Sequence, residues 1–154
     1  MKTKLFYLFI AVFLFSFSGK SQTYPTITLI GSGNGGWTDT AETPLLTDDG
    51  ITYTLVDKVL TDGELKFREG KCWTTGCPAT VTNTFGWGPT DAQFAVDGGW
   101  PSGTNAVPVD AGKNIQSKAG VWTITFNRIN GTWSFVPGTP LPIIKLVGSA
   151  VSTP

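Results

Sequence analysis

The sequence predicts an all-β fold, a sandwich or a barrel, from three observations. Glycine (19 residues) and proline (10) are plentiful beside Thr, Val, Phe and Trp, a mixture that favours short strands joined by tight turns. Several short segments alternate apolar and polar side chains, and turn residues separate them. No segment has the apolar periodicity of an amphipathic helix. The 154 residues suffice for about one domain, which we place at residues 26–136.

The expected strands are short and are bounded by turn residues. They cover, in order, residues 26–30, 43–47, 51–60, 63–69, 121–129 and 132–136. Asn130-Gly131 predicts a type I′ hairpin turn between the last two strands, because that turn needs positive φ at both central residues. The region between residues 70 and 112 is poor in strand signals, and loops this long are usually functional or disordered.

Side chains alternate along the strand at residues 63–69. Leu65 and Phe67 are expected to point into the core, and Glu64, Lys66 and Arg68 toward solvent. Solvated residues on an outward face are one interpretation of the two cations, and ligand contacts are the other.

The N-terminus has the features of an export signal. Lys2 and Lys4 precede an apolar run of 13 residues, and small residues before Gln22 suit cleavage there. We therefore expect a signal peptide at residues 1–21 and an exported protein, extracellular or at the cell surface. An uncleaved anchor is the alternative, although a membrane span needs ~20 residues. No cysteine follows the apolar run, so the sequence shows no site for lipid attachment.

Cys72 and Cys77 are the only cysteines. An exported chain with an even number of cysteines usually pairs them, so a disulfide is expected to stiffen the loop that holds Trp73. Two free thiols are the alternative. We expect no metal site, because two thiolates without any histidine cannot complete a tetrahedral site.

Composition argues against several classes of function. Lys+Arg and Asp+Glu both number 11 and no long basic run exists, which argues against nucleic-acid binding. The absence of histidine removes the commonest general base. Residues 31–36 match the dinucleotide fingerprint, but no helix is expected after them. The acidic residues lie mostly in turns, and nothing marks a facing pair as glycoside hydrolysis requires. We expect neither an enzyme nor a cofactor.

The six tryptophans divide between strands and loops. Trp122 and Trp133 alternate with polar residues inside strands, which predicts that they belong to the core. The others lie in loops rich in Gly, Thr and Pro: Trp37, Trp73, Trp87 and Trp100. A loop tryptophan either covers one end of a sandwich or offers a flat apolar face to a ligand. Pyranose C–H groups stack on such a face, and a nearby cation can hydrogen-bond the hydroxyls.

The C-terminal residues indicate a tandem repeat. Residues 137–142 (P-G-T-P-L-P) are typical of a stiff linker. Residues 143–149 (I-I-K-L-V-G-S) then resemble residues 26–32 (T-I-T-L-I-G-S). We interpret residues 143–154 as the first strand of a truncated second module. A coincidental strand in one complete domain is the alternative.

Three segments together carry a family resemblance over roughly residues 26–136. They are I-T-L-I-G-S through G-W at 27–37; G-E-L-K-F-R with Trp73 and F-G-W-G at 63–88; and K-N-I with G-V-W-T-I-T-F and G-T-W-S-F at 113–135. In order and spacing the chain resembles the starch-binding modules of the SusE/SusF family of Bacteroidetes outer-membrane surface proteins. The middle segment is the most specific of the three.

The resemblance implies an immunoglobulin-like antiparallel β-sandwich that binds α-glucans without catalysis and associates with outer-membrane glycan-uptake machinery. By match, Trp73 and Trp87 would be the stacking pair, with Lys66 or Arg68 supplying hydrogen bonds and Trp37 a further contact. Family members are typically lipoproteins with a spacer domain, and the sequence shows neither feature. A structural or adhesive immunoglobulin-like surface module without a sugar site is the alternative.

Overall fold

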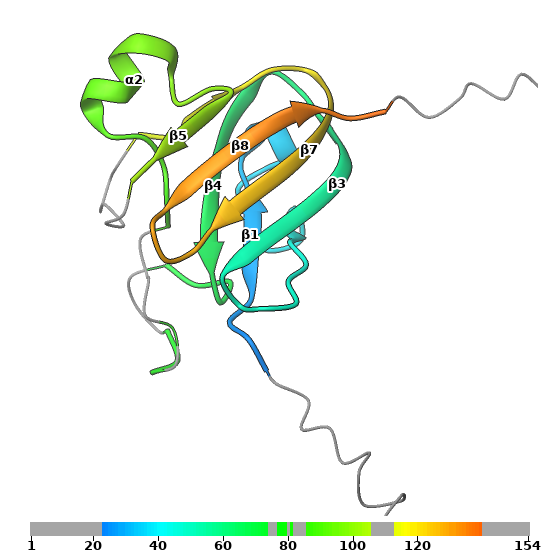
Figure 1. Ribbon diagram of the computed structural model, residues 1–154, viewed down its shortest axis with the longest axis vertical. Helices are drawn as coiled ribbons and strands as arrows, with labels where there is room; N and C mark the ends of the chain where they lie inside the picture. Colours follow the sequence, from blue (N-terminus) through cyan, green and yellow to red (C-terminus); the bar gives the residue numbers. More distant parts are fainter. Residues whose placement is uncertain (1–22, 74–76, 80, 82–85, 106–112, 140–154) are drawn as a thin grey trace, which may run out of the picture.

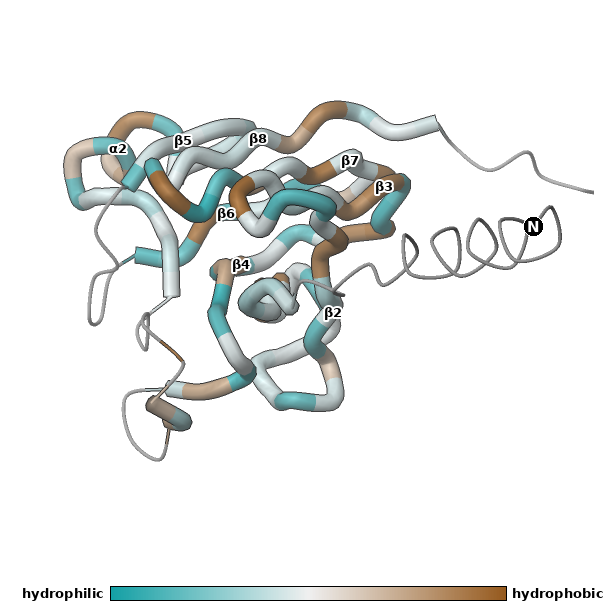
Figure 2. Tube along the Cα trace, turned by 60° about the horizontal axis from the view of Figure 1, so that its bottom comes forward, coloured by the Kyte–Doolittle hydropathy of each residue, from teal (hydrophilic) through white to brown (hydrophobic). Residues whose placement is uncertain are grey.

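The computed structural model describes residues 23–73, 77–79, 81, 86–105 and 113–139. These residues form two antiparallel four-stranded sheets, stacked as the layers of a β-sandwich-like fold (Figure 1). Figure 2 shows the layering from another side, with β3, β7 and β8 on one level and β4 and β2 on the other. The predicted signal peptide, the end of the predicted linker and the predicted repeat strand lie outside the described residues.

The first sheet has the strand order β2-β1-β4-β6. Its strands are β1 (Ile27–Ile30), β2 (Thr43–Pro44), β4 (Gly63–Glu69) and β6 (Ile115–Ser117). β1 runs antiparallel to β4, with Leu29 opposite Phe67. All four residues of β1 are buried, which fits a central strand whose two faces are both covered.

The second sheet has the order β3-β7-β8-β5. Its strands are β3 (Thr52–Leu60), β7 (Gly120–Asn127), β8 (Thr132–Pro137) and β5 (Ser102–Thr104). β7 pairs with β3 on one side and with β8 on the other. The β3–β7 register shifts between Leu55 and Lys58, where Asp57 has a φ of 51°. Such a bulge bends the strand locally.

Aromatic side chains join the two sheets. The Phe67 ring of β4 stacks on the Phe126 ring of β7, with centroids 4.5 Å apart. Trp133 is buried and its indole N–H donates to the Gly99 carbonyl at 2.9 Å, so its predicted place in the core is confirmed. Trp122 is only partly buried and packs against the edge of the core. The four clearest predicted strands, β3, β4, β7 and β8, are therefore present with their apolar faces inward.

The connection between β7 and β8 differs from the prediction. Asn127 is paired with Thr132, so four residues form the loop, and only Gly131 among them has positive φ, at 64°. The Asn127 side-chain oxygen accepts hydrogen bonds from the amides of Ile129 and Asn130 at 3.0 and 3.2 Å. The predicted two-residue type I′ turn is wrong, because this side chain stabilises a longer turn that begins earlier in the chain.

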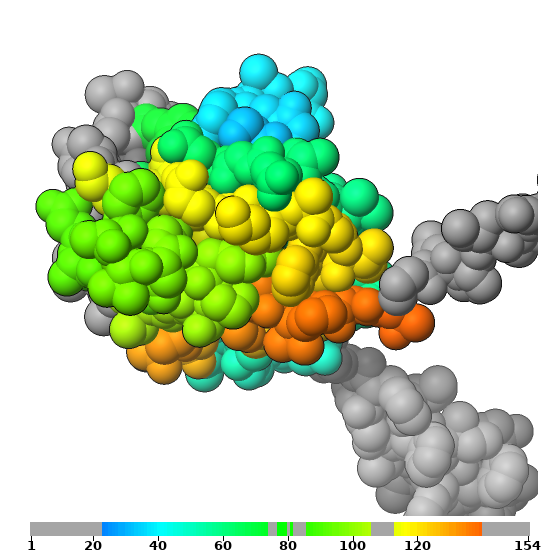
Figure 3. Space-filling model, turned by 90° about the horizontal axis from the view of Figure 1, so that it is seen from above, coloured from blue at the N-terminus to red at the C-terminus, as the bar shows by residue number. Residues whose placement is uncertain are grey.

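Two short helices were not predicted. The 3-10 helix η1 (Ser32–Asn34) follows β1, and α2 (Asp91–Asp97) precedes β5. The Thr90 hydroxyl caps α2 by accepting from the Gln93 amide, and Gly98 ends the helix with a φ of 67°. No residue of α2 is buried, and its seven residues are too few for helical periodicity to be recognised in the sequence. Figure 3 shows α2 and its neighbours forming much of the surface at one end of the sandwich.

Within the described part of the chain, neither helix is long and apolar enough to cross a membrane.

Candidate functional site

The outer face of β4 carries the cations that the sequence singled out, but both are buried. Lys66 is 6% exposed and Arg68 is 1% exposed. The strand alternation was predicted correctly, since Leu65 and Phe67 belong to the core. The expectation that Lys66 and Arg68 face solvent is wrong, because loops from elsewhere in the chain fold over this face of the sheet.

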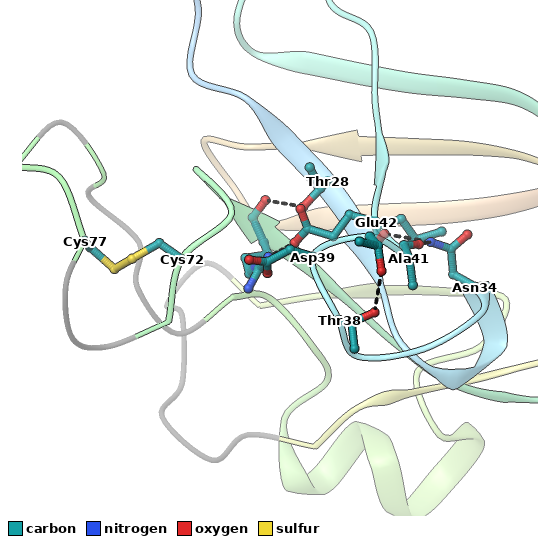
Figure 4. Close-up of polar contacts among 11 residues, drawn as sticks. Thr28, Asn34, Thr38, Asp39, Ala41, Glu42, Cys72 and Cys77 are labelled. Atoms are coloured by element: carbon teal, nitrogen blue, oxygen red, sulfur yellow. Dashed lines mark hydrogen bonds and ion pairs between the residues drawn. A yellow bond between two sulfur atoms is a disulfide. The ribbon is translucent and has the colours of Figure 1, made fainter.

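Arg68 is at the centre of these loops. One terminal nitrogen of its guanidinium, Nη2, lies 2.8 Å from Asp39 Oδ1 and also forms an ion pair with the Glu42 carboxylate. The guanidinium carbon lies 4.9 Å from the centroid of the Trp73 ring. In Figure 4, Asp39 and Glu42 extend from the loop that precedes β2, and the Cys72–Cys77 disulfide lies on the loop that follows β4. Arg68 therefore connects two loops that are distant in sequence.

The loop at residues 37–42 is held in place by a buried asparagine. The Asn34 side-chain amide donates to the carbonyl oxygens of Leu29 and Ala41, both at 2.8 Å, and its oxygen accepts from the Thr43 hydroxyl at 3.1 Å. These bonds join the two ends of the loop to β1 and thereby fix the position of Asp39. Sequence reasoning missed Asn34 and treated Asp39 and Glu42 only as acidic residues of turns. Their contact with Arg68 leaves no local pattern in the sequence.

Trp73 is half-buried and its surroundings restrict the ring. The predicted disulfide between Cys72 and Cys77 is present and closes the loop that begins at Trp73. Gly86 lies at the edge of the ring, where a Cβ atom would come within 3.2 Å of Trp73 Cζ3 and 2.6 Å of the Phe67 carbonyl oxygen. Gly86 also has a φ of 73°, so glycine suits this position for both reasons.

Trp87 is not part of an exposed platform. Its side chain is 4% exposed and packs edge-on against Phe126, with ring centroids 5.0 Å apart. Two backbone hydrogen bonds pair Trp87 with Phe67, at 2.8 and 3.1 Å. Because Phe67 points into the core, the residue paired with it points the same way. The expectation of an open Trp87 face is therefore wrong.

Trp37 is the most exposed of the predicted contacts, at 40%. It lies two residues before Asp39, and the hydroxyls of Thr38 and Thr40 lie 3.0 Å apart in the same loop. The structure thus brings Trp73 and Arg68 together, places Trp37 on the loop that Arg68 binds, and assigns Trp87 to the core.

A separate cavity of about 440 Å³ lies beside the start of β1. Its walls are formed by Thr23, Tyr24, Pro25, Thr26, Glu69, Gly70, Pro78 and Val81. The buried Glu69 in this wall pairs with Arg128 at 3.3 Å, which gives the carboxylate a structural partner. Among the described residues, no cluster of His, Cys, Asp and Glu could hold a metal ion.

The arrangement around Trp73 suits recognition of a hydroxyl-rich ligand. It combines a half-buried indole ring with an exposed carboxylate at Asp39, both held by Arg68 on loops that a rigid sheet supports, and Thr38 and Thr40 flank Asp39 in the sequence. Comparison with protein-family models, with curated proteins and with solved structures finds no match to this chain.

Proposed function

We propose that this protein is a non-catalytic polysaccharide-binding module and that Trp73 provides its stacking surface. The observation that carries the proposal is the contact between the Trp73 ring and the buried Arg68 guanidinium, beside the exposed loop at residues 37–40. A cation on one face of an indole fixes the ring, and a fixed ring loses little entropy when a sugar stacks on it.

The proposed site has one anchored ring where the sequence predicted two. Stacking on one aromatic ring contributes on the order of 1–3 kcal/mol, by analogy with nucleic-acid bases. Together with a few hydrogen bonds that compete with water, this gives a dissociation constant on the order of 1 mM for a single module. Several modules in one protein would raise the affinity through avidity, which fits the predicted tandem repeat.

The finer parts of the proposal rest on the family resemblance. We propose an immunoglobulin-like sandwich, α-glucan as the first glycan to test, and a location outside the cell or at its surface, in association with outer-membrane glycan-uptake machinery. The Cys72–Cys77 disulfide supports export, because disulfides persist in oxidising compartments.

Affinity electrophoresis tests the proposal. The protein is run in native gels containing amylose, pullulan or a β-glucan, with mobility normalised to a gel without polysaccharide. We expect retardation in at least one gel and its loss in Trp73→Ala. Trp87→Phe is the matched control, since this ring is buried and the change should preserve retardation. If no gel retards the wild-type protein, binding of α-glucans and of this β-glucan is disproved.

The alternative function is a structural or adhesive surface module without a sugar site. The burial of Lys66, Arg68 and Trp87 favours it, because all three residues serve packing. This alternative predicts that Trp73→Ala lowers the melting temperature and leaves electrophoretic mobility unchanged in every gel.

A further inference from the structure

We infer that the Trp73 site discriminates against anionic glycans and that Asp39 is the residue that sets this preference. The inference rests on the proposed polysaccharide binding and adds the class of ligand. It departs from the expectation drawn from the sequence, in which Lys66 and Arg68 offered positive charge to the ligand.

The first step concerns the charged groups that contact each other at the Trp73 site. Arg68 contacts the Trp73 ring and two carboxylates, those of Asp39 and Glu42. Arg68 and the Glu42 side chain are buried, whereas the Asp39 side chain is 73% exposed. A ligand that approaches this cluster from solvent therefore meets the Asp39 carboxylate before it meets the Arg68 cation.

The second step concerns the geometry of Asp39. Oδ1 is fixed by Arg68 Nη2 at 2.8 Å, and among the described residues no hydrogen bond is made to Oδ2. An ionised carboxylate only accepts hydrogen bonds, and each oxygen has two lone-pair sites. Asp39 can therefore accept from sugar hydroxyls while Arg68 holds it in place.

The third step is that the same guanidinium holds both the acceptor and the ring. Arg68 bonds Asp39 through Nη2, and its guanidinium carbon lies over the Trp73 ring, 4.9 Å from the centroid. The acceptor and the stacking surface are therefore fixed relative to each other before the ligand arrives, which reduces the entropy cost of binding. A uronate or sulfate group on the ligand would instead be repelled by Asp39, and salt would screen that repulsion.

The experiment compares neutral and anionic polysaccharides in affinity gels at low salt and at about 0.3 M salt, where the screening length falls below 8 Å. Amylose and pullulan are the neutral probes, and polygalacturonate and alginate are the anionic ones. We expect the wild-type protein to be retarded by a neutral probe and not by an anionic probe. Asp39→Asn keeps the shape and removes the charge, so neutral binding should weaken about tenfold and discrimination should fall.

Two control variants separate the role of Asp39 from general charge effects. Glu64→Gln makes the same change of charge on the outer face of β4, where Glu64 bonds Asn114 and Gln116. Lys71→Ala removes the exposed cation nearest to Trp73 in sequence. We expect both variants to bind and discriminate as the wild type does, with melting temperatures measured for all variants.

The outcomes distinguish this inference from the proposed function. Equal or stronger retardation by polygalacturonate, lost in Trp73→Ala, would overturn the inference and leave glycan binding intact. Unchanged binding in Asp39→Asn, or an equal loss in Glu64→Gln, would also overturn it. Absence of retardation in every gel would overturn both proposals.

Discussion

Arg68 is a buried cation, and at the scale of single residues its partners explain why the fold tolerates it. A buried charge costs several kcal/mol unless it is paired and hydrogen-bonded. Arg68 has two carboxylates at Nη2, and its guanidinium carbon lies over the Trp73 ring. The side chain of Glu42 is as buried as that of Arg68, so removing either charge would leave the other buried without its partner.

Replacing Arg68 with Met should destabilise the protein by about 3–5 kcal/mol, because the Glu42 carboxylate would remain buried without its cation. The free energy of unfolding is measured by urea denaturation. The double variant Arg68→Met with Glu42→Gln removes both charges and should recover part of the loss. If the single variant is as stable as the wild type, Arg68 and Glu42 are not a buried pair in solution.

Asp49 makes stability depend on pH. Hydrogen bonds from the backbone amides of Ile51 and Thr52 lower the pKa of the Asp49 carboxyl from its ordinary value of 3.8. A lowered pKa in the folded state means that the contribution is complete above pH 3.8 and is lost as the pH falls through the lower, folded-state value. The melting temperature of Asp49→Asn should therefore fall less than that of the wild type on acidification below pH 3.8. If the melting temperatures of the two proteins fall equally with pH below 3.8, this prediction is wrong.

At the scale of elements, β4 shows what the sequence reveals and what it conceals. Its bounds and inward face could be predicted because Leu65 and Phe67 alternate with charged residues. The burial of its outer face could not, because the covering groups Asp39, Glu42 and Trp73 come from loops without periodicity. The alternation of a strand predicts which of its side chains point into the core. It does not predict whether another part of the chain covers the opposite face.

Trp87 was misassigned for the same reason. Its burial depends on a backbone pairing with Phe67, twenty residues earlier in the chain, and no local pattern marks that pairing. The short elements α2, β5 and β6 were also beyond prediction, because three to seven residues give too little periodicity. The disulfide could be predicted, because the chain is expected to be exported and its two cysteines leave one pairing.

The disulfide loop provides a prediction about binding. Substituting both Cys72 and Cys77 by Ser should lower stability by about 2 kcal/mol, the loop-entropy value for so short a ring. Because Trp73 lies inside that ring, retardation in the glycan gel should weaken as well. Thermal unfolding and affinity electrophoresis are compared with and without a reducing agent. Reductant should reproduce both effects in the wild type and leave the double variant unchanged.

At the scale of the whole molecule, the core and the candidate site occupy different sides of the first sheet. The core lies between the sheets, where Phe126 contacts both Phe67 and Trp87. The Trp73 site lies on the outer side of β4. Stability and ligand binding should therefore respond to different substitutions, even though they share a strand.

Phe126→Ala tests this separation. Removing a buried phenylalanine costs about 3–5 kcal/mol. The loss should lower the urea midpoint strongly, and retardation in the glycan gel should be unchanged at temperatures where the variant is still folded. Trp73→Ala should abolish retardation in the glycan gel and lower the urea midpoint much less than Phe126→Ala does. If Phe126→Ala abolishes retardation while circular dichroism shows a folded protein, the site depends on the packing between the sheets.

The described chain enters below β1 and leaves at the far end of β8, at opposite ends of the sandwich (Figure 1). Units joined in series through such ends would extend in a line rather than double back on one another. Each copy would then place its Trp73 site at a regular interval along the line. A long polysaccharide would then bind several units at once. A force that pulls on the two ends of such an array would act on each sandwich between its two ends.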